Sequence, residues 1–288
     1  MSLTANDRLP GATGLASEPG LLLGRAARHL ALFLAIIAVW EAASATGLVD
    51  PLILPRPSAI VVSLYDMLFV RANVWYHMGV TLWEAIAGFV IGSIVGIALA
   101  VAAGLSETFR RYISPYVIVL QVIPRIALAP IIIAWLGFGT SPKIAIGALI
   151  CFFPPFINTL TGLLNIDEDA HEMFRSLGAS KRQIFFGLML PNATPIIMAG
   201  VKAAISLALI GAIVGEFISA GEGLGVLMQR YSFALNMSAS FAVLVVLTVV
   251  GYLLFVAMEK MDDHLVYWRN DARMAAMSRR RAKAWRAH

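Results

Sequence analysis

Charged residues and cysteines are both scarce in this sequence. Asp, Glu, Lys and Arg make up 14% of the 288 residues, whereas a soluble domain has about 25%. The one cysteine, Cys151, excludes an internal disulfide and lies in an apolar run, where we expect a small buried side chain. Hydrophobic residues make up 59% of the chain, which is more than one soluble core of this length can bury. Lipid must therefore solvate much of the protein.

Motifs of common enzyme and metal sites are also missing. The sequence has no GxxxxGK[ST] loop to hold nucleotide phosphates, no HExxH, no paired-cysteine spacing and no nucleophile elbow. The histidines are scattered among termini and connections: His29, His77, His171, His264 and His288. We therefore expect no catalytic residues, no metal site and no cofactor. We also expect no cluster of titratable residues at one membrane depth, which argues against a membrane enzyme.

Six apolar stretches are long enough to cross a membrane as helices, since a bilayer core needs about 20 apolar residues. They cover residues 29–48, 81–103, 115–136, 143–164, 194–217 and 241–258. Pro124 and Pro130 interrupt the third, and Pro154 and Pro155 the fourth, which is tolerated where neighbours satisfy the freed carbonyls. The sequence predicts an all-α integral membrane fold with about six transmembrane helices.

The ends of the chain are polar. Residues 1–24 have no apolar run of the kind that starts a signal peptide, so we predict a disordered leader, a transmembrane domain over 25–268 and a basic tail over 269–288. With a cytoplasmic N-terminus, sixteen basic residues lie inside, or nine without the tail, against four outside. Both termini are therefore predicted to be cytoplasmic. Beside six spans, the tail favours anionic lipid, or simply solvent, over nucleic acid.

Two sequence patterns indicate a helix on the outer face and close packing between membrane helices. Residues 50–78 begin with prolines and continue as an amphipathic run over 58–69, which predicts a helix along the outer surface. The second span carries Gly88, Gly92, Gly96, Ala100 and Gly104 at four-residue spacing. Such a face predicts close helix packing, although the same glycines could line a pore.

The connection 165–191 is too long for a simple turn and predicts two short cytoplasmic helices. Acidic residues open the first, as suits a helix N-terminus, and Gly178 ends it. Ser180 followed by Gln183 is a capping-box pattern that opens the second. The first helix has an apolar stripe at helical spacing, made of Ala170, Met173, Phe174 and Leu177. This stripe could lie on lipid, pack on its own subunit or dock into a soluble partner.

The same connection resembles the EAA motif of binding-protein-dependent ABC importer permeases. That motif reads Glu-Ala-Ala, three residues, Gly, nine residues, an aliphatic residue, any residue and Leu-Pro. Here Glu172, Gly178, Leu188, Leu190 and Pro191 fill its positions, and Met173 and Phe174 replace the two alanines. Bulkier apolar side chains there should still fill a groove.

Three further segments are similar to one branch of these permeases, the sulfonate, taurine and nitrate branch with its bicarbonate and pyrimidine- or thiamine-precursor relatives. They are residues 124–130, residues 135–139, and Glu216-Phe217 with Gly223-Leu224-Gly225. The resemblance implies a type I (MetI-like) permease fold in the bacterial inner membrane. It also implies two permease subunits, two separate ATPase subunits and a periplasmic solute-binding protein.

In such a permease the EAA loop couples to the ATPase and carries no chemistry of its own. The coupling residues implied here are Ala170, Glu172, Met173, Phe174, Leu177, Gly178, Ala179, Ser180, Leu190 and Pro191. The solute implied is small and anionic, with a pyrimidine or thiamine precursor as the alternative. Nothing in the sequence demands a second type of permease, so a homodimer is expected.

Arg125, Lys202 and Glu216 are charges inside or beside the spans, where a charge is costly and usually faces protein or water. Arg125 could give a positive potential to an anion path, or it could be a structural residue. Lys202 lies nearer the cytoplasmic surface, and Glu216, at the outer end of the same span, could pair across subunits or help shape the outer gate. A secondary transporter or channel is the competing class, but we find no internal repeat. An ABC exporter would need longer cytoplasmic helices.

Overall fold

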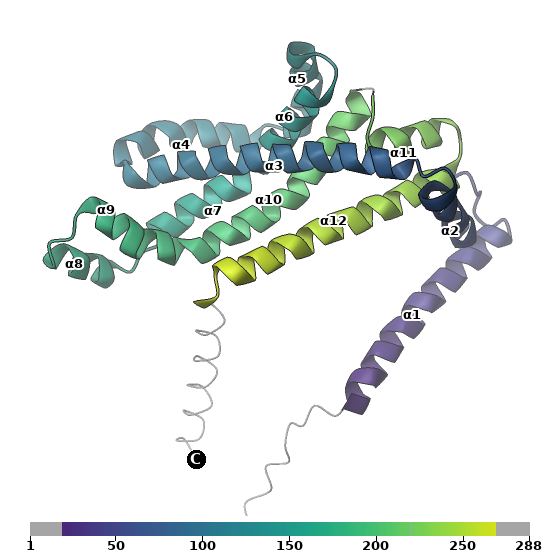
Figure 1. Cartoon of the computed structure of the whole chain (residues 1–288), viewed down its shortest axis with the longest axis horizontal. Coiled ribbons are helices and arrows are strands. Elements are labelled where there is room, and N and C mark those ends of the chain that lie inside the picture. The colour runs from purple at the N-terminus through teal and green to yellow at the C-terminus, as the bar shows by residue number, and fades with distance from the viewer. Residues whose placement is uncertain (1–18, 220, 269–288) are drawn as a thin grey trace, which may run out of the picture. The chain divides into compact units, whose positions relative to one another are not determined.

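The computed structural model describes residues 19–219 and 221–268, and these contain helices and no strand (Figure 1). The predicted all-α fold is confirmed. The basic tail 269–288 and most of the predicted leader lie outside the described residues, and α1 (Pro19–Ala45) already begins within the leader's range. The chain divides into two units, residues 1–59 and 60–288, which are described separately.

The first unit consists of α1 and the proline-containing link that follows it. Glu41 near the end of α1 accepts hydrogen bonds from the backbone N–H and hydroxyl of Ser58, at 3.0 and 2.8 Å. Ser44 donates to the Leu54 carbonyl at 3.1 Å. These bonds fold the link back onto the end of its own helix. The amphipathic run predicted at 58–69 is helical, as α2 (Pro57–Tyr65) and η1 (Asp66–Val70).

The core of the second unit is built from four helices: α3 (Val74–Leu105), α6 (Thr140–Cys151), α7 (Phe153–Leu164) and α10 (Leu190–Ile218). In Figure 1, α3 runs alongside α7 and α10. A Cβ at Gly92 would lie 2.5 Å from the Ala148 carbonyl oxygen, and one at Gly96 would lie 2.7 Å from that of Phe152. The glycine face of α3 therefore serves close packing, as predicted.

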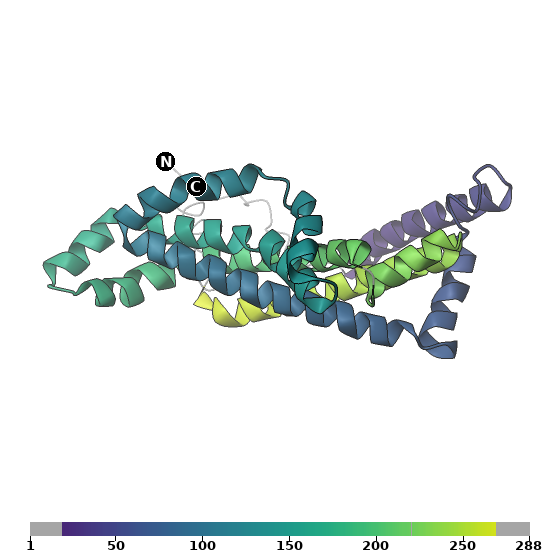
Figure 2. The same cartoon turned by 90° about the horizontal axis from the view of Figure 1, so that it is seen from above.

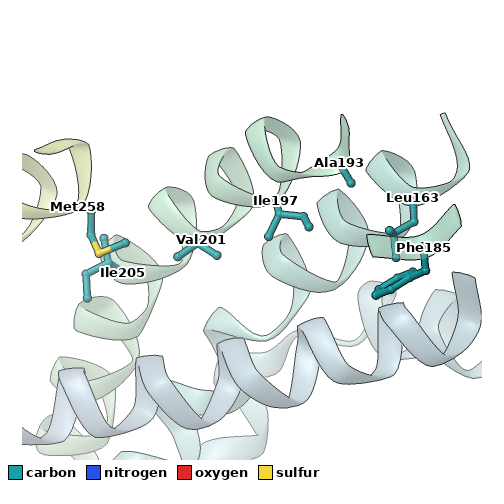
Figure 3. Close-up of a cluster of buried hydrophobic side chains, with 7 residues drawn as sticks. All are labelled: Leu163, Phe185, Ala193, Ile197, Val201, Ile205 and Met258. Carbon is teal, nitrogen blue, oxygen red and sulfur yellow. The ribbon is translucent and has the colours of Figure 1, made fainter. Parts of the chain in front are cut away.

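An apolar cluster joins α10 to its neighbours (Figure 3). Ile197, Val201 and Ile205 of α10 lie between Leu163 of α7 at one end and Met258 of α12 (Met237–Leu265) at the other. All are buried. This cluster attaches the last membrane helix to the helix that follows the predicted coupling loop.

The third predicted span is broken in the structure. α4 (Glu107–Val122) and the segment η2 (Arg125–Leu128) plus α5 (Ala129–Leu136) meet at 89°. Figure 2 shows this sharp turn between α4 and α5. Pro124 lies at the break, as predicted, but Pro130 lies in the first turn of α5, where the missing N–H has no helical partner in any case. The described residues contain five helices fit to span a membrane, or six if the bent pair counts as one.

The sequence did not predict α11 (Leu224–Phe233), which lies between α10 and α12. Its ten residues are too few to cross a bilayer. Gly221 and Gly223 precede it with φ values of +141° and +128°, a backbone region that residues with a side chain rarely adopt.

Candidate functional site

The predicted coupling connection folds as two short helices. α8 (Glu168–Ser176) and α9 (Lys181–Ile184) lie where the sequence places them, and η3 (Phe185–Met189) leads into α10. Asp167 caps α8 by accepting a hydrogen bond from the Asp169 N–H at 3.1 Å. Gly178 has φ +74°, and Ser180 and Gln183 form both bonds of the capping box. These local features are confirmed.

The apolar stripe of α8 is divided between two surfaces. Phe174 packs on η3, where a Cβ at Gly187 would lie 3.3 Å from its ring. Met173 and Leu177 are 54% and 78% exposed. One side of α8 is thus fixed to its own subunit, while the other presents two large apolar side chains beside Gly178.

The remaining loop residues surround these two side chains. Glu172 and Gly178 are exposed, Ala170 and Ala179 are half-buried, and Ser180 is exposed at the start of α9. Leu190 and Pro191 form the first turn of α10. Figure 1 shows α8 and α9 at one end of α10 and α11 at the opposite end. Because α10 has 29 residues, these ends are about 43 Å apart, more than a bilayer core.

A cluster of buried charged residues lies at the α11 end of the fold. Lys143 of α6, Glu84 of α3 and Glu216 of α10 are each at most 2% exposed. The Lys143 Nζ lies 3.1 Å from Glu84 Oε1 and donates to the Glu222 carbonyl at 2.7 Å. The expectation that no titratable cluster gathers at one depth was wrong, because Lys143 at the start of the predicted span 143–164 and Glu84 within the predicted span 81–103 were not recognised as partners.

Glu216 holds the start of α11 in place. Its carboxylate accepts hydrogen bonds from the Gly225 N–H and, at 2.6 Å, from the Thr81 hydroxyl. Thr81 in turn accepts from the Leu224 N–H at 2.8 Å. A Cβ at Gly225 would lie 2.7 Å from Glu216 Oε2, and one at Gly223 would overlap the same carboxylate. This contact explains why a glutamate and a Gly-Leu-Gly segment occur at that spacing.

The three predicted pathway residues are not brought together. Lys202 forms an ion pair with the buried Asp262 of α12 at 2.8 Å, and Glu216 belongs to the cluster above. Arg125 lies at the break between α4 and α5, where its Nη1 donates to the Ile150 carbonyl at 3.2 Å. The described part of the chain contains no group of three or more His, Cys, Asp or Glu side chains that could hold a metal.

Comparison with known proteins identifies the chain's family. Residues 88–266 match the family of binding-protein-dependent transport system inner membrane components. The chain belongs to this family. The match contains the predicted coupling loop, the break between α4 and α5 and the Glu216–Gly225 segment, whereas Thr81 and Glu84 of the buried cluster precede it.

Two relatives in this transport family span most of the chain. The formylaminopyrimidine transport permease protein ThiX of Halalkalibacterium halodurans is 35% identical over 82% of this chain and 94% of its own length. The putative aliphatic sulfonates transport permease protein SsuC of Escherichia coli is 34% identical over 81% of this chain and 88% of its own. The predicted permease family and its sulfonate branch are confirmed.

A solved transporter shares the fold of this inner-membrane component. A chain of the MetNI methionine ABC transporter, in an inward-facing conformation, matches with a TM-score of 0.59 over 69% of this chain and 97% of that chain. Only 21% of the aligned residues are identical, so the match concerns the fold. It confirms the predicted MetI-like architecture of an ABC importer permease.

Proposed function

We propose that this importer permease docks through α8 onto a separate ATPase subunit and forms, with a second copy of itself, a path for a small anionic solute. Two permeases and two ATPases would then make the complex, served by a solute-binding protein at the opposite face. ATP hydrolysis belongs to the ATPase, and the chain itself is not an enzyme. A pyrimidine or thiamine precursor is the alternative solute, since one relative is named for formylaminopyrimidine and another for aliphatic sulfonates.

The exposed pair Met173 and Leu177 carries the docking proposal. These side chains stand four residues apart on one face of α8, while Phe174 fixes the other face to η3. An amphipathic helix that presents paired apolar anchors fits a hydrophobic groove in a partner. Lipid is a poorer occupant for this face, because polar exposed residues, Glu172 and Ser176, flank the pair.

Docking at this position would transmit movement to the spans. α8 is attached to η3, and η3 continues into α10. α10 packs against α3, α6, α7 and α12, so a displacement of α8 acts on a helix in contact with all of them. Under this proposal α8 is cytoplasmic, α11 faces the outside and both termini are cytoplasmic, in agreement with the distribution of basic residues.

The test is purification of the tagged chain, co-expressed with its neighbouring genes, in mild detergent. We expect an ATPase to co-purify at one copy per permease and to be lost with Leu177→Asp, which would place a charge in an apolar groove. Gly178→Asp should have the same effect, because a side chain there is strained at φ +74°.

Thr108→Asp is the matched control. Thr108 is exposed in the first turn of α4, where an added carboxylate suits the helix N-terminus, so this variant should retain the ATPase. A permease that purifies alone and still moves solute with an ion gradient would make the chain a secondary transporter. Retention of the ATPase by Leu177→Asp would remove α8 from the interface.

A further inference from the structure

Arg125 occupies a position of unusual geometry for a charged residue. It lies directly after the break at Pro124, where α4 ends and the chain turns by 89°. Its partner Ile150 lies ten residues after the start and fourteen before the end of the span Thr140–Leu164. At 1.5 Å per residue these separations are about 15 and 21 Å. The guanidinium therefore lies near the middle of the membrane.

The contacts of Arg125 use little of its hydrogen-bonding capacity. Ile150 has a free carbonyl because Pro154, four residues later, has no N–H to donate, and Arg125 Nη1 supplies that bond. The guanidinium carbon lies 4.4 Å from the centre of the Phe153 ring, a cation–π contact. Within the described residues, no carboxylate lies within ion-pair distance of Arg125. Four of its five N–H donors have no hydrogen bond to these residues.

A hollow opens beside this guanidinium. It has a volume of about 340 Å³ and is lined by Gln121 at the end of α4, by Arg125, and by apolar residues including Ile126 and Ile150. Solute cavities in proteins usually measure about 300–1,000 Å³, with apolar walls and a few polar groups. The hollow combines such walls with one fixed cation and one amide.

We propose that this hollow is a solute-contact site of the permease and that Arg125 binds an anionic oxygen group, such as a sulfonate or carboxylate. The proposal rests on the proposed transport function and adds to it the place and chemistry of solute contact. A guanidinium fork matches two oxygens of such a group. A cation near the membrane centre without a carboxylate partner is costly, and a passing anion would remove that cost.

The geometry also favours release of the solute. The carbonyl of Ile150 and the ring of Phe153 keep Arg125 stabilised when the hollow is empty, so the anion is not needed to hold the fold together. Transport requires binding that is favourable enough for entry and weak enough for exit. Lys202, by contrast, is held by Asp262, and Glu216 by the α11 cluster. Of the two predicted pathway cations, Arg125 is the one without a carboxylate partner among the described residues.

A cysteine-accessibility experiment on the whole transporter in membranes tests this site without knowledge of the solute. Ile126, which lines the hollow and is 55% exposed, is changed to Cys, while the native Cys151 is buried and should react slowly. The reaction rates of two methanethiosulfonate reagents are compared, one carrying a sulfonate and one a trimethylammonium group. We expect the sulfonate reagent to be favoured by about tenfold, from the potential of the nearby charge. Arg125→Gln should abolish the preference, although glutamine can still donate to the Ile150 carbonyl.

Competition shows whether the site binds an anion or only has a positive potential. Methanesulfonate at tens of millimolar should slow the sulfonate reagent in the Arg125 protein, compared with choline chloride at equal ionic strength. It should have no such effect with Arg125→Gln. Tyr116→Cys, exposed on α4 nine residues before Arg125, should show neither the preference nor the competition.

Two further variants allow for an Arg125→Gln protein that does not assemble. Arg125→Lys should keep the reagent preference, whereas Gln121→Glu should abolish it by supplying an internal counter-ion. Equal reagent ratios with arginine and glutamine, an unaltered ratio in Gln121→Glu, or no competition by methanesulfonate would each overturn the proposal. Because no ATPase is needed for these rates, their failure is distinguishable from failure of the docking proposal.

Discussion

Lys143 and Glu84 form an ion pair of 3.1 Å between Nζ and Oε1, with exposures of 2% and 0%. A second buried carboxylate, Glu216, belongs to the same cluster and bonds to Thr81 and Gly225. One ammonium thus stands beside two carboxylates at the point where α3, α6 and α10 approach the start of α11. Removal of the lysine would leave both acidic groups buried without it.

Lys143→Met should therefore strongly destabilise the protein. Loss of one partner from a buried ion pair costs about 3–5 kcal/mol, which corresponds to a fall of about 5–8 °C in melting temperature for a chain of this size. Thermal unfolding in detergent, followed by tryptophan fluorescence, measures the shift. The double variant Lys143→Met with Glu84→Gln should recover part of the loss, since one uncompensated carboxylate is then absent.

The exposed ion pair of Arg71 and Asp66 provides a control for this prediction. The nitrogen–oxygen distance is 2.8 Å, but the side chains are 63% and 34% exposed, and such pairs contribute about 0–1 kcal/mol. Arg71→Met should melt within a few degrees of the parent protein. If Lys143→Met has the same melting temperature as Arg71→Met, the buried cluster contributes nothing to stability.

The sequence predicted the spans and the helices of the loop 165–191 well because their signals are local. Apolar length identifies a membrane helix, and the Ser180–Gln183 capping box and Gly178 set the ends of α8 and α9 within a few residues. The 89° turn at Pro124 was predicted only as a break, because the angle depends on how α5 packs on α6.

The buried cluster could not be predicted from local pattern alone. Glu84 and Lys143 are 59 positions apart in the sequence, and each looks like a residue near the end of its own span. Their pairing needs the close approach of α3 and α6 that the glycines allow. A signal was present nonetheless: Glu84 is a charge inside a long apolar run, and such a residue calls for a partner.

The glycines of α3 give a second prediction, in which a Gly→Ala substitution lowers stability at one position and raises it at another. Gly92→Ala should destabilise the protein, because its Cβ would lie 2.5 Å from both the Ala148 carbonyl oxygen and the Cys151 sulfur. The helix backbones would have to separate, at a cost of about 1–3 kcal/mol. Gly79→Ala on the same helix meets nothing within 4 Å and should stabilise the helix by about 0.5–1 kcal/mol.

Melting temperatures of the two glycine variants, measured side by side, check this prediction. A destabilised Gly92→Ala with a stabilised Gly79→Ala shows that the face packs against α6. Equal shifts in melting temperature for the two variants would contradict close packing and support the alternative that these glycines line a pore. Altered uptake without altered stability would support that alternative directly.

The ion pair of Lys202 and Asp262 gives a third prediction, which distinguishes a structural role of Lys202 from a role in the solute path. Their charged atoms are 2.8 Å apart, and Asp262 is fully buried. Lys202→Met should lower the melting temperature, because the Asp262 carboxylate loses this cation. The double variant Lys202→Met with Asp262→Leu should recover most of that stability, since packed apolar residues often replace a buried ion pair at little cost. Glu259→Gln, at an exposed position one turn from Asp262 on α12, is the control and should leave the melting temperature unchanged.

Uptake per molecule in the double variant then decides the role of Lys202. We expect it to match the parent protein, because the structure gives Lys202 a partner that holds α10 to α12 and so accounts for the buried charge. A stable double variant that no longer transports would show that the ammonium is needed by the solute itself. In that case Lys202 would lie in the solute path together with Arg125, and its ion pair with Asp262 would have to break during transport. Asp262→Asn in the otherwise unchanged protein should then raise the uptake rate.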